Sequence, residues 1–417
     1  MRKKKDTVYK KKPELLSPAG DWPSLTSSVE AGCDAVYFGV KGMNMRHSAS
    51  NFDALEMGKV MEFLRARKKK GYLALNITIY DRETGKIKRL LEAASSAGVN
   101  GVIAWDMAAM SMALELGMEV HLSTQASVSN FEAVRYYSSA GVKRIVLARE
   151  CGLSEIAAIK SKIRKAGIDC EIEVFVHGAM CVSISGRCFL SQLSFNRSAN
   201  RGDCLQPCRR KYRITDIPEE GRPECEYVLG EDYILSPRDL CTVMFIDRLI
   251  DAGVDAFKIE GRMRSPEYCA VVTSAYKEAI DAYFRGGLDD KLKHGIFEKL
   301  RGAFNRGFSS GFYLGRPEDL GGEISKKYEK IYVGEVVKYY KKISVAEILV
   351  KAAPLYAGQK ILITGRSTPA GFFTLEDMEI EHSPVREVAQ GTAVGVKVPF
   401  RVRRNDKVFI WNEEKSP

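Results

Sequence analysis

The chain has 417 residues, of which 45% are hydrophobic, 28% charged and 9% aromatic, so it is expected to fold into two or three domains and is neither disordered nor collagen-like. No run approaches the roughly 18 uncharged apolar residues of a membrane-spanning helix, and no apolar leader follows the N-terminus, which predicts a cytoplasmic protein without membrane contact. The formal net charge is +11, and residues 1–12 hold seven Lys and Arg against one Asp. We expect this segment to be a solvated basic tail, with nucleic-acid contact as the alternative.

Residues 13–285 alternate short apolar runs with longer helix-like segments, which is the pattern of repeated βα units. The eight candidate strands are 14–16, 35–38, 72–77, 101–105, 119–123, 144–148, 171–176 and 256–259. Glycines are expected to end six of the intervening helices, at Gly32, Gly98, Gly117, Gly141, Gly167 and Gly253. Eight units close a ring, and no Gly-x-Gly-x-x-Gly motif follows the first strand. The sequence therefore predicts an α/β fold, a TIM-type (β/α)8 barrel, rather than a doubly wound sheet.

The pattern of alternating strand-like and helix-like segments ends after the eighth unit. Residues 286–327 are expected to form a helical linker that ends in an aromatic, glycine-rich loop. Short β-like runs follow at 331–337, 343–350, 358–364, 391–398 and 407–411. They predict that residues 328–417 form a small C-terminal antiparallel β-barrel-like domain.

A long insertion, residues 177–235, follows the seventh strand and carries Cys181, Cys188, Cys204 and Cys208. A loop at the C-terminal end of a barrel strand lies on the face where active sites occur. Four thiolates suit either zinc or an iron–sulfur cluster. Zinc sites usually present cysteine pairs two to four residues apart, whereas six residues separate the first pair here. The spacing favours a 4Fe-4S cluster, with Zn as the alternative and Cys241 as a reserve fourth ligand.

The insertion is also basic. Its candidate substrate-binding residues are Arg187, Arg201, Arg209 and Tyr212. Arginines beside an aromatic residue suit a phosphate-bearing polymer or a small anion. The alternative is a solvated basic surface.

Polar residues gather at the predicted strand ends, which line one mouth of a barrel. Candidate substrate-binding residues there are Arg46, Asn76, Gln125 and Arg262, and candidate catalytic residues are Arg149, Glu150, His177, Lys258 and Glu260. Lys258 and Glu260 alternate in phase along one strand, so they form either a structural ion pair or part of the site. His177 is either a base or a structural support. No Gly-x-Ser-x-Gly or His-Glu-x-x-His motif supports a hydrolase.

The run Glu173-x-Phe175-x-x-Gly178-Ala-Met-Cys181-x4-Gly186-x-Cys188-x-Leu-Ser191 resembles the signature of the collagenase-like peptidases, the U32 peptidase family. The segments 13–20, 34–39, 123–126 and 258–264 extend the resemblance over the predicted barrel. The better-understood members of that family are oxygen-independent hydroxylases that act on the wobble uridine of tRNA with prephenate, on a cytidine of rRNA, or on a quinone. The resemblance implies a 4Fe-4S cluster held by Cys181, Cys188, Cys204 and either Cys208 or Cys241.

We therefore expect a tRNA-modifying hydroxylase that uses prephenate as a small anionic oxygen donor, with the base stacking on Tyr212 or Phe195. Whether it needs a related partner protein is left open. The alternatives are an rRNA cytidine hydroxylase, a collagenase-like peptidase, and a non-catalytic RNA-binding protein whose cluster is structural.

Overall fold

The computed structural model describes residues 11–46, 49–212, 235–315 and 328–413. Eight parallel strands form a closed ring, which confirms the predicted barrel. They are β1 (Glu14–Ala19), β2 (Ala35–Phe38), β3 (Lys70–Ala74), β4 (Gly101–Ala104), β5 (Glu119–Leu122), β6 (Arg144–Val146), β7 (Glu171–Gly178) and β9 (Ala256–Ile259). β9 pairs with both β7 and β1, and these two pairings close the ring.

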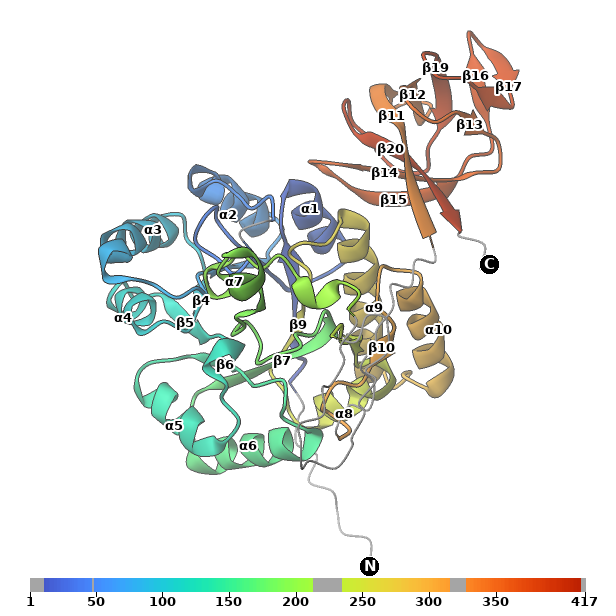
Figure 1. Ribbon diagram of the computed structural model, residues 1–417. Coiled ribbons are helices and arrows are strands. Elements are labelled where there is room, and N and C mark those ends of the chain that lie inside the picture. The colour runs from blue at the N-terminus through green and yellow to red at the C-terminus, as the bar shows by residue number, and fades with distance from the viewer. Residues whose placement is uncertain (1–10, 47–48, 213–234, 316–327, 414–417) are drawn as a thin grey trace, which may run out of the picture.

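Helices surround the ring (Figure 1). They are α1 (Trp22–Glu30), α2 (Met57–Arg65), α3 (Thr84–Ser96), α4 (Met107–Glu115), α5 (Phe131–Ser139), α6 (Leu153–Ala166), α8 (Ile246–Asp251) and α9 (Pro266–Phe284). All six predicted helix-ending glycines have a positive φ, between 62° and 95°. At Gly167, directly after α6, φ is 62°, a left-handed conformation that glycine adopts without steric cost.

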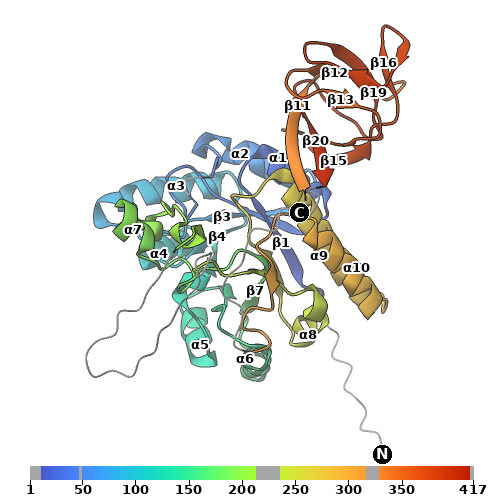
Figure 2. The same ribbon diagram turned by 45° about the vertical axis from the view of Figure 1, so that its right-hand side comes forward.

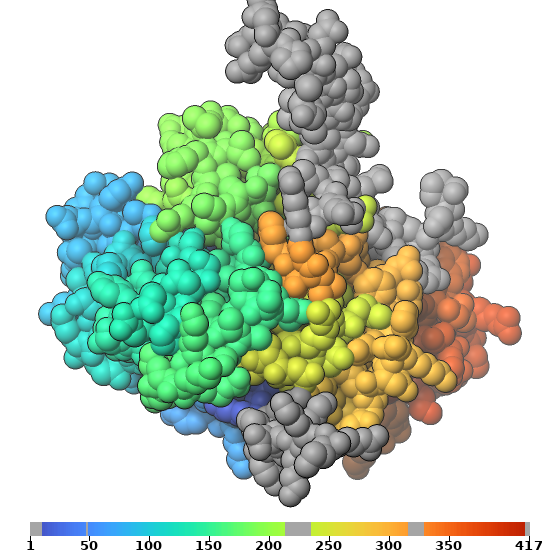
Figure 3. All heavy atoms as spheres, turned by 90° about the horizontal axis from the view of Figure 1, so that it is seen from below, coloured from blue at the N-terminus to red at the C-terminus, as the bar shows by residue number. Residues whose placement is uncertain are grey.

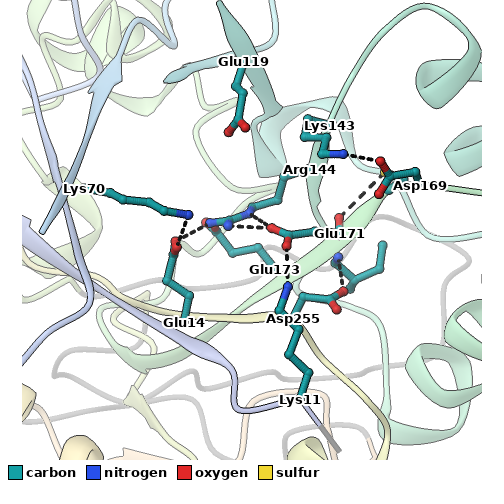
Figure 4. A network of polar contacts seen from close by, with 12 residues as sticks. Lys11, Glu14, Lys70, Glu119, Lys143, Arg144, Asp169, Glu171, Glu173 and Asp255 are labelled. Atoms are coloured by element: carbon teal, nitrogen blue, oxygen red, sulfur yellow. Dashed lines mark hydrogen bonds and ion pairs between the residues drawn. The ribbon is translucent and has the colours of Figure 1, made fainter. Parts of the chain in front are cut away.

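The barrel interior holds a layer of buried charge near the amino ends of its strands (Figure 4). The guanidinium of Arg144 on β6 lies 2.7 Å from the carboxylate of Glu14, 2.6 Å from that of Glu171 and 3.3 Å from that of Glu173. Lys258 on β9 completes the set, because its Nζ donates to Glu173 Oε1 at 2.7 Å. Burial alone would raise the pKa of Glu171, but Arg144 and Lys11 hold that pKa at about 2. Every buried carboxylate of this layer therefore has a cation within contact distance.

Residues 286–315, the described part of the predicted linker, pack onto the barrel. Helix α10 (Asp290–Arg301) contributes Ile296 and Leu300 to the core that the barrel shares with its helices. Farther on, the hydroxyl of Tyr313 donates to the Phe175 carbonyl at 2.6 Å. The short strand β10 (Phe308–Ser309) pairs with β8 (Asp239–Cys241), which is itself antiparallel to β7.

The C-terminal domain is an antiparallel sheet domain, as predicted. Its main sheet has the order β15-β14-β20-β11-β12-β19-β16-β17, and β13 pairs with β18 beside it. The bounds are β11 Tyr328–Tyr340, β12 Val345–Val350, β13 Leu355–Tyr356, β14 Lys360–Gly365, β15 Thr368–Thr374, β16 Met378–Ile380, β17 Ser383–Val385, β18 Glu387–Val388, β19 Ala393–Lys397 and β20 Lys407–Glu413. The sequence missed β15 because its Pro369 and Gly371 are residues that usually argue against a strand.

This domain contacts the barrel through α1 and α9. The Thr26 hydroxyl of α1 donates to the Arg366 carbonyl at 2.9 Å, and the Ala370 amide donates to Ser27 Oγ at 3.1 Å. Lys330 on β11 pairs with Glu267 in the first turn of α9 at 3.0 Å. In Figure 2 the domain stands beside α1 and α9, and in Figure 3 it adjoins the α9–α10 side of the barrel.

Within the described ranges, we find no helix whose length and apolar character would let it span a bilayer.

Replacing Arg144 with methionine is expected to lower the free energy of unfolding by about 3–5 kcal/mol, because the substitution leaves three partly or fully buried carboxylates without their shared cation. Urea unfolding at pH 7 measures the change. The matched control is Arg135→Met, whose partner Glu132 is exposed, so the loss there should stay below about 1 kcal/mol. Similar losses in both variants would contradict a structural role for the network.

Candidate functional site

Two adjoining cavities open at the carboxyl ends of the barrel strands. The inner one has a volume of about 60 Å³ and is lined by residues of the barrel wall and its loops. The outer one has a volume of about 350 Å³ and lies beneath the cysteine-bearing insertion. Met45, Arg46, Cys181 and Glu260 line both, so a ligand could occupy the two together.

Glu260, directly after β9, is the carboxylate of the inner cavity. Its Oε1 accepts from Arg46 Nη2 at 3.0 Å, and the Tyr37 hydroxyl lies 3.4 Å from its Oε2. Burial alone would raise the pKa of Glu260, but Arg46, Arg149 and Arg262 hold that pKa at about 2. Glu260 is therefore ionised at neutral pH and can orient cations or accept a hydrogen bond.

Two arginines of the inner cavity, the buried Arg262 and the half-buried Arg149, have incomplete hydrogen bonding. Arg262 Nη1 donates to Asn44 Oδ1 at 2.8 Å, and Arg149 Nη1 donates to the Ala179 carbonyl at 2.7 Å. The Nε atoms of both arginines are buried without a partner among the described residues. Burial lowers the pKa of Arg262 to about 10. A bound anion would supply the missing acceptor and stabilise the charged form.

Lys258 also lines the inner cavity, where its ammonium lies 4.6 Å from the centre of the Tyr37 ring. Its Nζ is bound to Glu173, so Lys258 belongs to both the structural charge layer and the cavity wall. Burial lowers the pKa of Lys258, and Glu173 partly opposes that effect.

Asn76 and Gln125 form the amide wall of the inner cavity. Asn76 Nδ2 donates to Gln125 Oε1 at 2.9 Å, and Gln125 Nε2 donates to the Asn76 carbonyl at 2.8 Å. The insertion closes on this wall at Gly186, whose φ is 77°. A Cβ there would lie 2.9 Å from Gln125 Cγ, so the close approach requires glycine.

The four cysteines of the insertion line the outer cavity together. Short helices hold the loop between them: α7 (Leu190–Phe195), η4 (Ala199–Arg201) and η5 (Pro207–Arg209). The Cys188 amide donates to Asn200 Oδ1 at 3.0 Å, and the Leu190 amide lies 3.5 Å from Cys188 Sγ. Burial raises the pKa of Cys208, and Arg209 partly offsets the rise.

Cys241 lies elsewhere. It is buried in β8, where the Tyr276 hydroxyl lies 3.8 Å from its Sγ, and it lines neither cavity. The structure thus brings Cys208, not Cys241, together with the other three cysteines.

The basic residues of the insertion have different surroundings. Arg209 lines the outer cavity and donates to Ser236 Oγ at 3.0 Å and to the Pro237 carbonyl at 2.8 Å. Arg201 lines neither cavity. Its guanidinium instead forms a bidentate ion pair with Glu83.

Arg187 and Tyr212 also lie outside the two cavities. Arg187 is exposed and stacks 4.8 Å from the Trp105 ring. The Tyr212 hydroxyl donates to the Pro207 carbonyl at 2.8 Å.

Two predicted catalytic residues do not reach the cavities. His177 is buried among Tyr276, Tyr268 and Phe308, and burial, with a smaller contribution from Arg264, lowers its pKa to about 3. A register irregularity between Phe175 and His177 interrupts the alternation along β7, and His177 packs against α9 and β10 instead of facing the cavity. Glu150 lines a separate surface recess beside Leu153 and Arg248.

Several lining residues escaped the sequence analysis. In the outer cavity they include Met263, Arg264, Phe304 and Arg306. Asp239 on β8 accepts from Arg264 at 3.3 Å and from Arg306 at 3.0 Å. The aromatic, glycine-rich loop after α10 could have indicated that this segment contributes to the site, because such loops are unusual in a simple linker.

The chain resembles known proteins over most of its length. A family model described as Peptidase family U32 matches residues 20–322. The chain is 40% identical over 417 residues to a protein of Porphyromonas gingivalis (strain ATCC BAA-308 / W83) named Collagenase, covering 97% of this chain and 99% of that one.

Two further relatives carry names that refer to RNA. The tRNA hydroxylation protein P1 of Bacillus subtilis (strain 168) is 37% identical over 335 residues, which cover 78% of each chain. The 23S rRNA 5-hydroxycytidine C2501 synthase of Escherichia coli (strain K12) is 36% identical over 334 residues, 79% of this chain and 49% of that one.

A pH comparison separates a structural His177 from a catalytic base. Because its folded-state pKa of about 3 is below the ordinary value near 6.5, the unfolded state takes up the proton first. Stability is therefore lost as the pH falls below about 6.5, by about 2 kcal/mol at pH 5. Between pH 7.5 and pH 5, the free energy of unfolding of His177→Leu should therefore fall by about 2 kcal/mol less than that of the wild-type protein, as measured by urea unfolding.

His294→Gln is the control, since His294 is exposed on α10, and it should keep the wild-type pH dependence. A folded His177→Leu protein with the wild-type pH dependence and no activity would instead identify His177 as catalytic.

Proposed function

The chain belongs to peptidase family U32, and we propose that it is an RNA hydroxylase that adds a hydroxyl group to C5 of the tRNA wobble uridine. In this proposal a 4Fe-4S cluster is bound by Cys181, Cys188, Cys204 and Cys208, and prephenate is the oxygen donor. The main support for the proposal is that a cavity lined by four cysteines adjoins a cavity lined by four cationic side chains. The names of the B. subtilis and E. coli relatives support RNA hydroxylation as the reaction class.

The donor set of the outer cavity fits an iron–sulfur cluster. Four thiols line it, and an amide N–H points at one sulfur, a contact of the kind that tunes such clusters. Arg46, Arg209, Arg264 and Arg306 also line the cavity and would offset the negative charge of thiolate ligands. Among the described residues, no three His, Cys, Asp or Glu side chains converge tightly enough to hold a single metal ion. Four thiols around one cavity match the four cysteine ligands of a four-iron cluster, and such a cluster would supply electron transfer.

The charge of the inner cavity suits the anionic groups of a co-substrate that extends into the adjoining outer cavity. Arg46, Arg149, Lys258 and Arg262 contribute four positive charges, while Glu260 and the Lys258 partner Glu173 contribute two negative ones. The resulting net charge of +2 would balance the two carboxylates of prephenate. The Nε atoms of Arg149 and Arg262, which have no partner among the residues that the structure describes, are the donors that an anion would engage.

The reaction sets further requirements. Replacing a ring hydrogen by a hydroxyl group removes two electrons from the pyrimidine, and the donor that gives up the oxygen atom takes them. Glu260 is ionised and held by Arg46, so it can accept a hydrogen bond from the ring or from the donor but cannot supply a proton. The Asn76–Gln125 amide pair is fixed by its own hydrogen bonds and can position a ring edge.

A peptidase is the second candidate, because the P. gingivalis relative is named Collagenase. A cysteine peptidase needs a base beside its thiol. Among the described residues, no histidine lines either cavity with Cys181, and His177 is buried elsewhere. The observation that favours the hydroxylase is instead the four-cysteine cavity joined to the cation-lined one.

Protein purified without oxygen is expected to be brown and to contain about four irons and four acid-labile sulfides per chain. Cys181→Ala and Cys208→Ala should each lose most of that iron, because each removes a thiolate ligand. Cys241→Ala is the matched control and should keep it, since Cys241 lies outside the cavity. A colourless protein with one zinc, or iron loss only in Cys241→Ala, would overturn the ligand assignment.

Nucleoside analysis tests the reaction. tRNA from a strain lacking the gene should lack 5-hydroxyuridine-type nucleosides, and the wild-type gene should restore them. Arg262→Gln should restore less than about a tenth, because it removes a buried cation from the donor cavity. Lys86→Gln, on the exposed face of α3, should restore them fully. Unchanged tRNA together with gelatin cleavage by the purified protein would favour the peptidase.

A further inference from the structure

A basic groove crosses the C-terminal domain, outside the cavities described above. It lies between the end of β11 and the loop that precedes β20, and its volume is about 590 Å³. Its lining is Val337, Lys338, Tyr339, Lys341, Arg401, Val402, Arg403 and Arg404. Five of these eight residues are cations, and none is a carboxylate. The groove therefore presents concentrated positive charge to solvent.

Most of this charge is available to a ligand. Lys341, Arg401 and Arg404 are exposed and form no ion pair with a carboxylate in the part of the chain that the structure describes. Asp406 accepts a hydrogen bond from the Arg403 amide at 2.7 Å, and Glu335 on β11 is already paired with Lys351 and Lys407. Like charges held together without counterions repel one another, and the contact with an anion would relieve that repulsion.

Arg403, another cation of the groove, is engaged in hydrogen bonds within the domain. Its Nη1 donates to the Ser367 carbonyl and to Thr368 Oγ1, the latter at 2.9 Å, and so ties the groove to the β14–β15 turn. The same turn carries Arg366, whose guanidinium stacks 4.9 Å from the Trp22 ring at the start of α1. The groove is thereby linked to the barrel through a short chain of side-chain contacts.

These contacts place the groove on a defined side of the barrel. Trp22 opens α1 and Glu267 lies in the first turn of α9. Both helices begin directly after the carboxyl end of a barrel strand, which is the end where the two cavities open. The domain is thus anchored at the rim of the catalytic face, beside α1 and α9 in Figures 1 and 2.

We propose that this groove binds the phosphate backbone of the RNA whose base enters the cavities. The inference rests on the proposed function and adds the surface that holds the body of the substrate. Lys and Arg contacts to phosphates supply affinity without reading sequence. Aromatic and apolar side chains lie beside the cations, at Tyr339, Tyr340 and Val337, and suit ribose and base contacts.

A structured RNA fits better than the other anionic surfaces. The groove is concave and lies between the end of β11 and the loop before β20, whereas a bilayer surface would require a flat or convex basic face. The cavities accept only a small part of a large substrate. A second contact site at the rim would supply the binding energy that positions the reacting base.

The test uses the full-length holoprotein with unmodified tRNA. Arg401→Gln combined with Arg404→Gln should weaken tRNA binding about 5- to 20-fold near 0.15 M salt and reduce the slope of log Kd against log salt by about 2, one for each lost phosphate contact. In hydroxylation assays the same variant should raise KM for tRNA while kcat at saturation stays unchanged. Arg403 is left in place because it also holds the β14–β15 turn.

The matched control is Lys86→Gln combined with Arg89→Gln, which removes the same charge from the exposed face of α3 and should change tRNA affinity less than about twofold. Equal weakening in both double variants, or none in either, would overturn the proposal. Loss of binding to anionic phospholipid vesicles in the Arg401/Arg404 variant, with tRNA binding intact, would overturn it in favour of a membrane contact. The proposed function fails separately, if the wild-type protein neither binds tRNA nor modifies it.

Discussion

The arrangement of the barrel depends on charge that is buried inside it and neutralised there. Arg144 gathers carboxylates from β1 and β7, and Lys258 reaches Glu173 from β9. Charges taken out of water must find partners with good geometry, because their desolvation costs several kcal/mol per ion. The strands that supply these groups are therefore constrained in register. The same constraint sets the height at which Lys258, and Glu260 two residues later, enter the interior.

Because the lower interior is filled by this ion network, the open space lies at the other end of the barrel. There Arg46, Arg149 and Arg262 converge on one carboxylate, and two guanidinium Nε atoms find no acceptor within the described part of the chain. Net positive charge and unsatisfied hydrogen-bond donors in this cavity would favour the binding of an anion. The cysteine cavity adjoins it and shares Arg46, Cys181 and Glu260 with it, so the cluster and the anionic donor that we propose would lie in neighbouring spaces.

Three segments far apart in sequence enclose this site. The insertion closes over the mouth at Gly186, the segment after α10 contributes Phe304 and Arg306, and the loop after β9 contributes Met263 and Arg264. Asp239 joins the last two segments by accepting from both Arg264 and Arg306. The residues expected to form a linker thus complete the cavity wall, while the C-terminal domain is attached to the same rim through α1 and α9.

The sequence alone determined the barrel, because hydrophobic runs of strand length and helix-ending glycines are local signals. It also singled out the four insertion cysteines, since their residue type and crowding are visible without any fold. It could not place His177, because a register irregularity in β7 turned that side chain away from the cavity and into the packing around Tyr276.

Nor could the sequence separate Cys208 from Cys241, or recognise that Arg201 is engaged by Glu83. Cys241 is held beside Tyr276, 35 positions away, and Arg201 is held by Glu83, 118 positions away. Only the tertiary structure decided these outcomes, because the pairing of distant side chains is set by how the strands close the ring and how the loops pack on it.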